Sequence, residues 1–164
     1  AMMMGGSEDD AAATTPKTPV VPTLPSGQYV KLVQTSLTDV INLAELEVFA
    51  KAGTTNLAAG KTVTSSAFHP AGPLPHLVDG NMTNFAHTMN EVADTEDSML
   101  IDLGSVQEIE KIKITNRVDC CSERTIGIKA VILGADGTTV IKETTAITTD
   151  AATYTFTFPG TAWV

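Results

Sequence analysis

The sequence predicts an all-β fold, a jelly-roll β-sandwich, from three observations: short strand-like segments, turn signals between them, and no sustained helical pattern. The segments are apolar or alternate apolar with polar residues, and valine, isoleucine and threonine dominate them. They are residues 29–33, 44–49, 99–103, 111–115, 126–133, 138–142 and 153–158. Glycine-containing turns at 51–53, 79–81 and 135–137 separate several of them. Short strands at near-regular spacing are typical of β-sandwiches and jelly rolls.

The length of 164 residues predicts one domain, which we expect over residues 27–164. We interpret residues 1–26 as a disordered Pro/Thr/Ala-rich tail or linker. Its prolines, Pro16, Pro19, Pro22 and Pro25, have the spacing of an extended polyproline spacer. A docking segment is the alternative interpretation.

Composition excludes several classes of function. The net charge of −9 disfavours a nucleic-acid surface and docking on an anionic membrane, because no basic stripe is present. No apolar run approaches the roughly 20 residues that a membrane-spanning helix needs. No serine, histidine and aspartate occur in a recognisable catalytic context, and the cysteines lack the spacing of redox or zinc motifs. We therefore expect no enzyme.

The most specific chemistry lies in the loop of residues 116–124, which follows the strand-like segment 111–115. Arg117 and Arg124 flank Asp119 in this loop. Arginine presents a planar fork of donors that can hold two hydroxyl oxygens or a carboxylate. A carboxylate beside the guanidinium groups can fix their rotamers, so that a polar ligand meets a pre-oriented site.

The same loop contains the only two cysteines of the chain, Cys120 and Cys121, which are adjacent. Consecutive Cα atoms are about 3.8 Å apart, below the usual disulfide range, so a bond between them is strained and rare. If it forms, it presents a rigid apolar face beside the arginines. The alternative is two reduced thiols in a surface charge cluster.

Residues 116–124 closely resemble the Asn-Arg-x-Asp-Cys-Cys-x-Glu-Arg segment of the F-type (fucose-binding) lectins. These lectins belong to the galactose-binding-domain-like superfamily, together with discoidin and coagulation-factor C domains. Residues 56–66 resemble the opening strand of that superfamily, 77–81 its Asp-Gly-Asn turn and 101–104 its Asp-Leu-Gly strand. The resemblance extends from Asn56 to about Phe158.

The resemblance implies a sugar site. In the lectins, a histidine and two arginines hold the hydroxyls and ring oxygen of L-fucose, and the vicinal disulfide packs on an apolar face of the sugar. The aspartate would orient the two arginines. The corresponding residues of this chain are His87, Arg117, Asp119, Cys120, Cys121 and Arg124.

The chain departs from the lectin pattern between His87 and Arg117, where it is longer. The extra length falls in the acidic segment 91–97, which we expect at the rim of the site, where it would cover, narrow or redirect the pocket. We interpret His69, in a proline-rich loop, as polar surface rather than as a ligand contact.

The resemblance also implies a structural calcium ion, a cation that prefers several oxygen ligands. The expected ligands are the side chains of Asp79 and Glu45 and the backbone carbonyls of Ala44, His76, Asn81 and Asn84. The alternative interpretation of Glu45 is an outward-facing polar residue on an alternating strand.

Glu45 enters this set because the closing strands of the family occur early in the chain. Residues 28–33 and 43–49 resemble the Tyr-Val-x-Leu and Leu-x-Glu-x-Glu-Val-Phe strands that the family carries after a segment like 154–160. We therefore expect circularly permuted or shifted module boundaries, with the N-terminal strands pairing beside the C-terminal ones.

The leading hypothesis is a lectin, a carbohydrate-binding module for fucose or a related glycan with a structural calcium ion. The alternative is a structural or adhesive decoration module, on a cell surface or particle assembly, with a degenerate sugar pocket. An ancillary domain of a glycan-active enzyme is a third hypothesis. An oxidised cysteine pair implies an extracellular or surface location. Weak monosaccharide binding is usually reinforced by multivalency, so an oligomer or larger assembly is expected.

Overall fold

The computed structural model describes residues 23–92 and 94–164 and confirms the all-β prediction. Its strands are β1 (Ser26–Gln34), β2 (Asn42–Phe49), β3 (Thr62–Thr64), β4 (Ala86–His87), β5 (Ser98–Glu108), β6 (Lys111–Asn116), β7 (Ile128–Leu133), β8 (Val140–Glu143) and β9 (Thr153–Thr157). Two short 3₁₀ helices, η1 (Leu74–Val78) and η2 (Ser122–Thr125), complete the elements. Most of the expected tail, residues 1–22, lies outside the described residues, and β1 begins one residue before the expected domain start.

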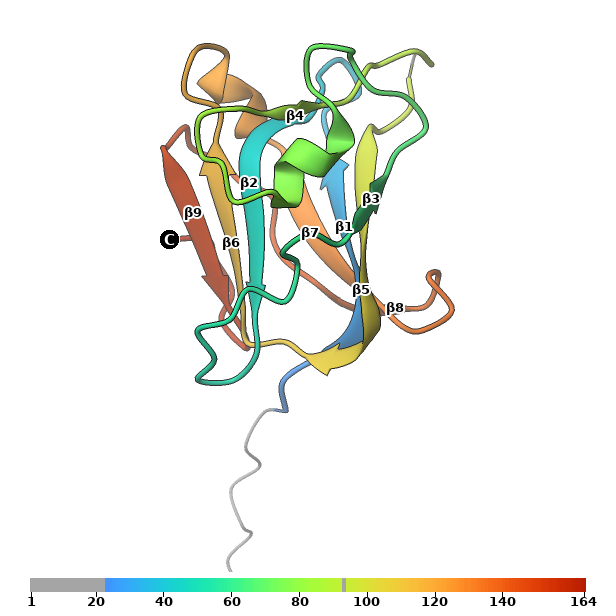
Figure 1. Ribbon diagram of the computed structural model, residues 1–164, viewed down its shortest axis with the longest axis vertical. Helices are drawn as coiled ribbons and strands as arrows, with labels where there is room; N and C mark the ends of the chain where they lie inside the picture. Colours follow the sequence, from blue (N-terminus) through green and yellow to red (C-terminus); the bar gives the residue numbers. More distant parts are fainter. Residues whose placement is uncertain (1–22, 93) are drawn as a thin grey trace, which may run out of the picture.

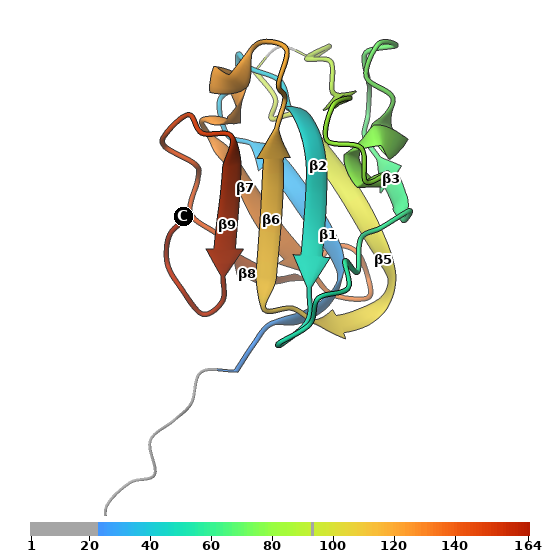
Figure 2. The ribbon, with the colours of Figure 1, turned by 60° about the vertical axis from the view of Figure 1, so that its left-hand side comes forward.

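The strands form two antiparallel sheets that face each other as a sandwich (Figure 1). One sheet has five strands in the order β3-β5-β1-β7-β8, and the other has four in the order β4-β2-β6-β9. Figure 2 shows the four-stranded sheet in front of the five-stranded one, with loops gathered at the end where β6 finishes. Among the described residues, no helix is long and apolar enough to cross a bilayer.

The core lies between the sheets and follows from the period-2 alternation of the strands. In β6, Ile112 and Ile114 are fully buried, whereas Lys111 and Lys113 remain partly exposed on the other face. Burial of each such isoleucine stabilises the fold by about 1.5–3 kcal/mol. Phe156 of β9 faces the same core.

The N-terminal strands occupy central positions. β1 lies between β5 and β7, and β2 lies between β4 and β6. Both therefore pair with strands of the second half of the chain, as expected, but neither pairs with the last strand. β9 pairs with β6 instead, and Val164 pairs with Thr155 of β9.

Two strand boundaries differ from the predictions for local reasons. The strand expected from residue 126 begins at Ile128, because Gly127 has a φ of +97° and directly precedes it. The strand expected from residue 138 begins at Val140, because Asp136 accepts the backbone N–H groups of Thr138 and Thr139 and holds them in a turn.

Candidate functional site

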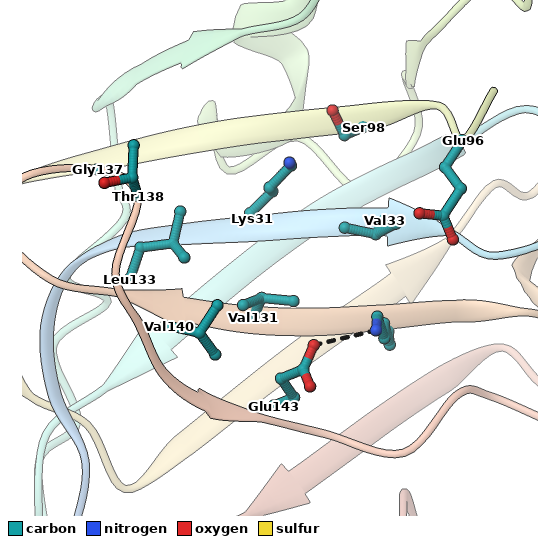
Figure 3. Close-up of a pocket in the computed structure, with 11 residues that line it drawn as sticks. Lys31, Val33, Glu96, Ser98, Val131, Leu133, Gly137, Thr138, Val140 and Glu143 are labelled. Atoms are coloured by element: carbon teal, nitrogen blue, oxygen red, sulfur yellow. Dashed lines mark hydrogen bonds and ion pairs between the residues drawn. The ribbon is translucent and has the colours of Figure 1, made fainter.

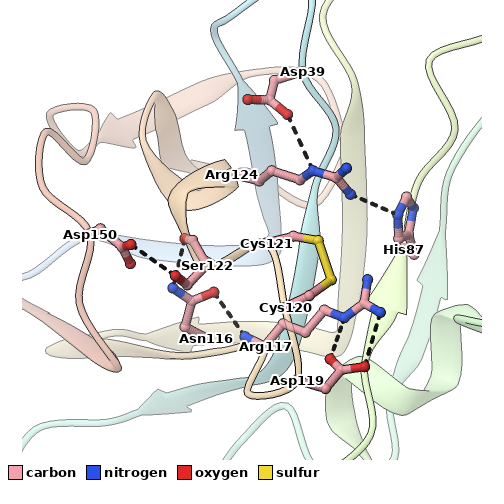
Figure 4. The surroundings of a disulfide bond; sticks show 10 residues. All are labelled: Asp39, His87, Asn116, Arg117, Asp119, Cys120, Cys121, Ser122, Arg124 and Asp150. Atoms are coloured by element: carbon pink, nitrogen blue, oxygen red, sulfur yellow. Dashed lines mark hydrogen bonds and ion pairs between the residues drawn. A yellow bond between two sulfur atoms is a disulfide. The ribbon is translucent and has the colours of Figure 1, made fainter.

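Residues 116–124, here called the motif loop, lie beside His87 at one end of the four-stranded sheet (Figure 4). His87 ends β4, Arg117 directly follows β6, and Arg124 lies in η2. β2 separates β4 from β6 in the sheet, and its first residue, Asn42, is the register partner of His87. This strand order brings together residues that are far apart in sequence.

Cys120 and Cys121 form a disulfide, with their Cα atoms 3.8 Å apart. Cys121 has a φ of +63°, which turns the chain sharply into η2. The carbonyl of Cys121 accepts a hydrogen bond of 3.2 Å from the backbone N–H of Arg124. Figure 4 shows the disulfide between the side chains of the two arginines. The alternative of two free thiols does not describe this structure.

Arg117 is held from two directions. Its Nε donates to Asp119 Oδ1 at 2.6 Å and its Nη2 to Oδ2 at 3.1 Å, a bidentate pair. Its guanidinium lies 3.6 Å from the ring centroid of Phe85, a cation–π contact. The side chain is 13% exposed. Hydrogen bonding from Arg117 holds the pKa of Asp119 below its ordinary value, so the pair stays charged.

Arg124 has a different carboxylate partner from the one expected. Its Nε lies 3.9 Å from Asp39 Oδ1, in the β1–β2 loop. Asp119 makes its ion pair with Arg117, and among the described residues none joins it to Arg124. The prediction that Asp119 orients both arginines is therefore wrong for Arg124. The cause is non-local, since Asp39 belongs to a loop distant in sequence.

The surroundings of His87 favour its neutral imidazole form, with Nε2 toward Arg124. Its Nδ1 contacts the carbonyl of Thr88 closely, which assigns the proton to Nδ1. Its Nε2 lies 3.4 Å from Arg124 Nη1. Burial lowers the pKa of His87, and neighbouring His69, Arg124 and Arg117 lower it further, against the opposing effect of the Thr88 carbonyl.

Contacts place two residues of the acidic segment 91–97. Asp97 is buried, and its Oδ2 accepts a hydrogen bond of 2.5 Å from the Thr88 hydroxyl. Glu96 instead lines a groove of about 540 Å³ on the outer face of the five-stranded sheet (Figure 3). Lys129 and Glu143 form an ion pair of 3.0 Å in this groove. Asp97 is thus bound to the residue that follows His87, and Glu96 lies beside the groove on the five-stranded sheet, so the expected rim position of the segment stays a prediction.

Sequence reasoning missed several neighbours of the motif. The ring of Phe85 makes the cation–π contact with Arg117. The ring centroid of His69, which we interpreted as polar surface, lies 5.2 Å from that of His87. Phe85 precedes His87 by two residues, a spacing that would have signalled a shared strand face. Asn42 is fully buried, and neither of its side-chain polar atoms has a partner among the described residues. Asn42, Asp39 and His69 lack any local signal, because the fold alone brings them here.

A second cluster, of oxygen atoms, lies where β2 meets the turn after η1. Glu45 of β2 is 1% exposed, and its Oε2 accepts the N–H of Gly80 at 2.8 Å. Asp79 accepts the N–H of Asn81 at 2.9 Å and the amide of Asn84 at 2.7 Å. Burial, with a contribution from the Asp79 carboxylate, raises the pKa of Glu45 to about 7. Glu45 is thus buried rather than outward-facing.

Three oxygens of this cluster lack donors. Glu45 Oε1, Glu47 Oε1 and Asn84 Oδ1 are buried, and none has a hydrogen-bond partner among the described residues. Buried acceptors of this kind are ordinarily paired, and a hard cation satisfies them as well as a donor does. Within residues 23–92 and 94–164, no group of three or more His, Cys, Asp or Glu side chains is arranged to hold a metal ion. Any cation here would therefore rely partly on amide and carbonyl oxygens.

The fold and the loop site together define a class: a β-sandwich binding module whose candidate ligand contacts lie in loops at one end of the sheets. The family model described as NedA-like, galactose-binding domain matches residues 76–163, just over half of the chain. The chain belongs to this discoidin-like galactose-binding domain family, which confirms the predicted superfamily. Searches of curated proteins and of solved structures found no match.

The family supports the coarser part of the functional hypothesis. Its members are galactose-binding domains, so the chain is a carbohydrate-binding module. Domains of this discoidin-like type are typically non-catalytic. The match begins at His76 and therefore includes β4 to β9, whereas β1 and β2, the central strands of the two sheets, precede it.

Proposed function

We propose that this domain is a lectin that binds L-fucose or a closely related terminal sugar between His87, Arg117 and Arg124. The observation that supports this most strongly is the convergence of two separately anchored arginines and one neutral histidine around the Cys120–Cys121 disulfide. These groups offer donors, an acceptor and an apolar contact within one short stretch of surface.

The contacts leave specific atoms for a sugar. Arg117 uses Nε and Nη2 for Asp119, and Arg124 directs Nε to Asp39 and Nη1 to His87. Nη1 of Arg117 and Nη2 of Arg124 have no partner among the described residues and would donate to hydroxyl and ring oxygens. On sugar binding, the Nε2 lone pair of His87 would exchange its long contact with Arg124 Nη1 for a sugar hydroxyl. The disulfide would pack against the C–H face or methyl group.

We further propose that a calcium ion occupies the oxygen cluster. The Glu45 and Asp79 side chains would hold it, with carbonyl oxygens of Ala44, His76, Asn81 and Asn84 as the remaining candidates. The unpaired, buried Oε1 of Glu45 supports this assignment. The ion would fasten the turn at 79–84 to β2. This turn leads directly into Phe85 and His87, so the metal would stabilise one side of the sugar site.

A glycan array, followed by calorimetry with methyl α-L-fucoside, tests the sugar proposal. Wild type should select fucosylated glycans, and Arg117→Ala and Arg124→Ala should each reduce affinity at least tenfold, the usual cost of losing a charged hydrogen bond. Lys142→Ala, an exposed cation on β8, serves as the matched control. An array without any bound sugar, with folded protein, would instead favour the structural or adhesive decoration module.

We also propose an extracellular or surface location, because adjacent cysteines persist as a disulfide in oxidising compartments. Thiol labelling of the protein taken directly from its native source tests this. Unreacted Cys120 and Cys121 support it, and quantitative labelling without reductant contradicts it.

A further inference from the structure

A cavity of about 440 Å³ adjoins the sugar site on the flank of the motif loop that faces away from His87. Residues 116–118 and Ser122 line one side, and residues 150–152 line the other. Arg117 therefore belongs both to the candidate sugar site and to the wall of this cavity. In Figure 4, Asp150 and Ser122 lie on one side of the disulfide and His87 on the other.

The two walls of this cavity are fixed to each other. Asn116 donates from its amide nitrogen to the carbonyls of Ser122 and Ala151, both at 2.9 Å. The buried hydroxyl of Tyr154 accepts the N–H of Ala151 and donates to Thr149, each at 2.7 Å. The cavity is thus formed before any ligand arrives, which lowers the entropic cost of binding.

The lining has the chemistry of a sugar contact. Ser122 Oγ donates to Asp150 Oδ2 at 2.8 Å, and Asp150 Oδ1 has no partner in the part of the chain that the structure describes. A carboxylate beside a hydroxyl can accept from neighbouring sugar hydroxyls. Val118, 67% exposed, and the alanines at 151 and 152 offer an apolar surface for C–H groups.

The charge of this surface selects among glycans. Asp150 is the only carboxylate in the cavity lining, and the one cation of the lining, Arg117, is already paired with Asp119. The unbalanced charge at this cavity is therefore the negative charge of Asp150. Anionic substituents, such as sulfate or sialic acid, would meet like charges there.

We propose that this cavity is a second subsite, which holds the inner residues of a neutral oligosaccharide whose terminal sugar occupies the Arg117–Arg124 site. The proposal rests on the proposed function. An occupant of both sites must pass over the disulfide loop, so the preferred ligand is an extended neutral glycan rather than a monosaccharide.

Calorimetry with methyl α-L-fucoside, a neutral fucosylated trisaccharide and its sulfated counterpart tests this. Wild type should bind the neutral trisaccharide about fivefold more tightly than the monosaccharide, the scale of one or two net hydrogen bonds. Asp150→Ala should abolish this advantage and leave the monosaccharide affinity unchanged. Asp150→Asn should raise the affinity of the sulfated trisaccharide relative to the neutral one. Glu108→Ala, at the far end of β5, is the matched control, and thermal melts verify that each variant folds.

The outcomes separate the two proposals. Fucoside binding that depends on Arg124, with a trisaccharide advantage that Asp150→Ala does not change, overturns the subsite alone. Equal affinity of wild type for monosaccharide and trisaccharide also overturns it. If wild type does not bind the fucoside, or if Arg124→Ala leaves fucoside binding unchanged, the proposed function is overturned and the subsite with it.

Discussion

At the scale of the residue, two titratable groups have pKa values shifted from their ordinary values, in opposite directions. Glu45 is buried beside a second carboxylate, and His87 is partly buried beside two guanidinium groups. Both environments favour the neutral form, as burial and like charge require. Each therefore makes a distinct, measurable contribution to pH dependence.

Glu45 should make the metal-free domain more stable in mild acid. Its folded pKa of about 7 exceeds its ordinary value of 4.5, so the folded state binds the extra proton between these values. Stability should rise as the pH falls from 7 to 4.5 and should be lost as the pH rises through 7, by on the order of 3 kcal/mol. Glu45→Gln should flatten this profile and exceed wild type in melting temperature at pH 8 in chelator.

Calcium should reverse the ranking at pH 8, because the ion favours the ionised carboxylate. Added calcium should then raise the melting temperature of wild type but not of Glu45→Gln. Superimposable profiles of the two proteins in chelator would contradict the Glu45 assignment. An unchanged wild-type melt on adding calcium would contradict the metal site.

His87 should make sugar binding sensitive to acid. Since its pKa lies below the ordinary value, the affinity for methyl α-L-fucoside should be constant from pH 8 to about 6.5. It should fall at lower pH, where protonation removes the acceptor and places a cation beside Arg124. His87→Gln keeps a side-chain acceptor and should bind independently of pH over this range. A persistent acid loss in the variant would assign the effect to another group.

At the scale of the element, the β6–η2 connection depends on Asn116. This buried side chain bonds the carbonyls of Ser122 and Ala151 and accepts the N–H of Arg117, so it organises both flanks of the motif loop. Its position at the end of a regular strand explains why the loop leaves the sheet at a defined point.

Asn116→Ala should lower the free energy of unfolding by about 1–3 kcal/mol, because it leaves buried polar groups without partners. Urea denaturation measures this change. The neighbouring variant Thr115→Ala faces away from the core and should cost much less. Equal losses in the two variants would show that the amide bonds contribute little.

The regular elements were predictable where a period was long enough to read. The lysine–isoleucine alternation of β6 predicted its strand correctly. β4 has only two residues and η1 only five, too few for a period to appear in the sequence. Pro73 and Pro75 also made the segment of η1 read as a loop. The contiguous motif placed Arg117 and Arg124 in one loop, but Asp39 and His69 come from other loops and required the fold.

At the scale of the whole molecule, β1 and β2 complete the sheets although they precede the segment that matches the family. Each supplies pairing on both of its edges. The matched segment alone would therefore leave a gap in the middle of each sheet, with unpaired edges on both sides.

A fragment of residues 76–164 should consequently fail to fold, as circular dichroism and amide hydrogen exchange would show. A second fragment, residues 23–75, should restore structure when mixed with it, because it returns both central strands. A cooperative thermal transition of the fragment 76–164 alone would contradict the essential role of β1 and β2.

β2 has a further consequence, because one strand reaches both proposed sites. Asn42 pairs with His87 beside the sugar site, and Glu45 follows on the same strand in the oxygen cluster. If binding at one site changes the affinity of the other, the coupling between them must be reciprocal. The factor by which calcium changes the affinity for fucose must equal the factor by which fucose changes the affinity for calcium.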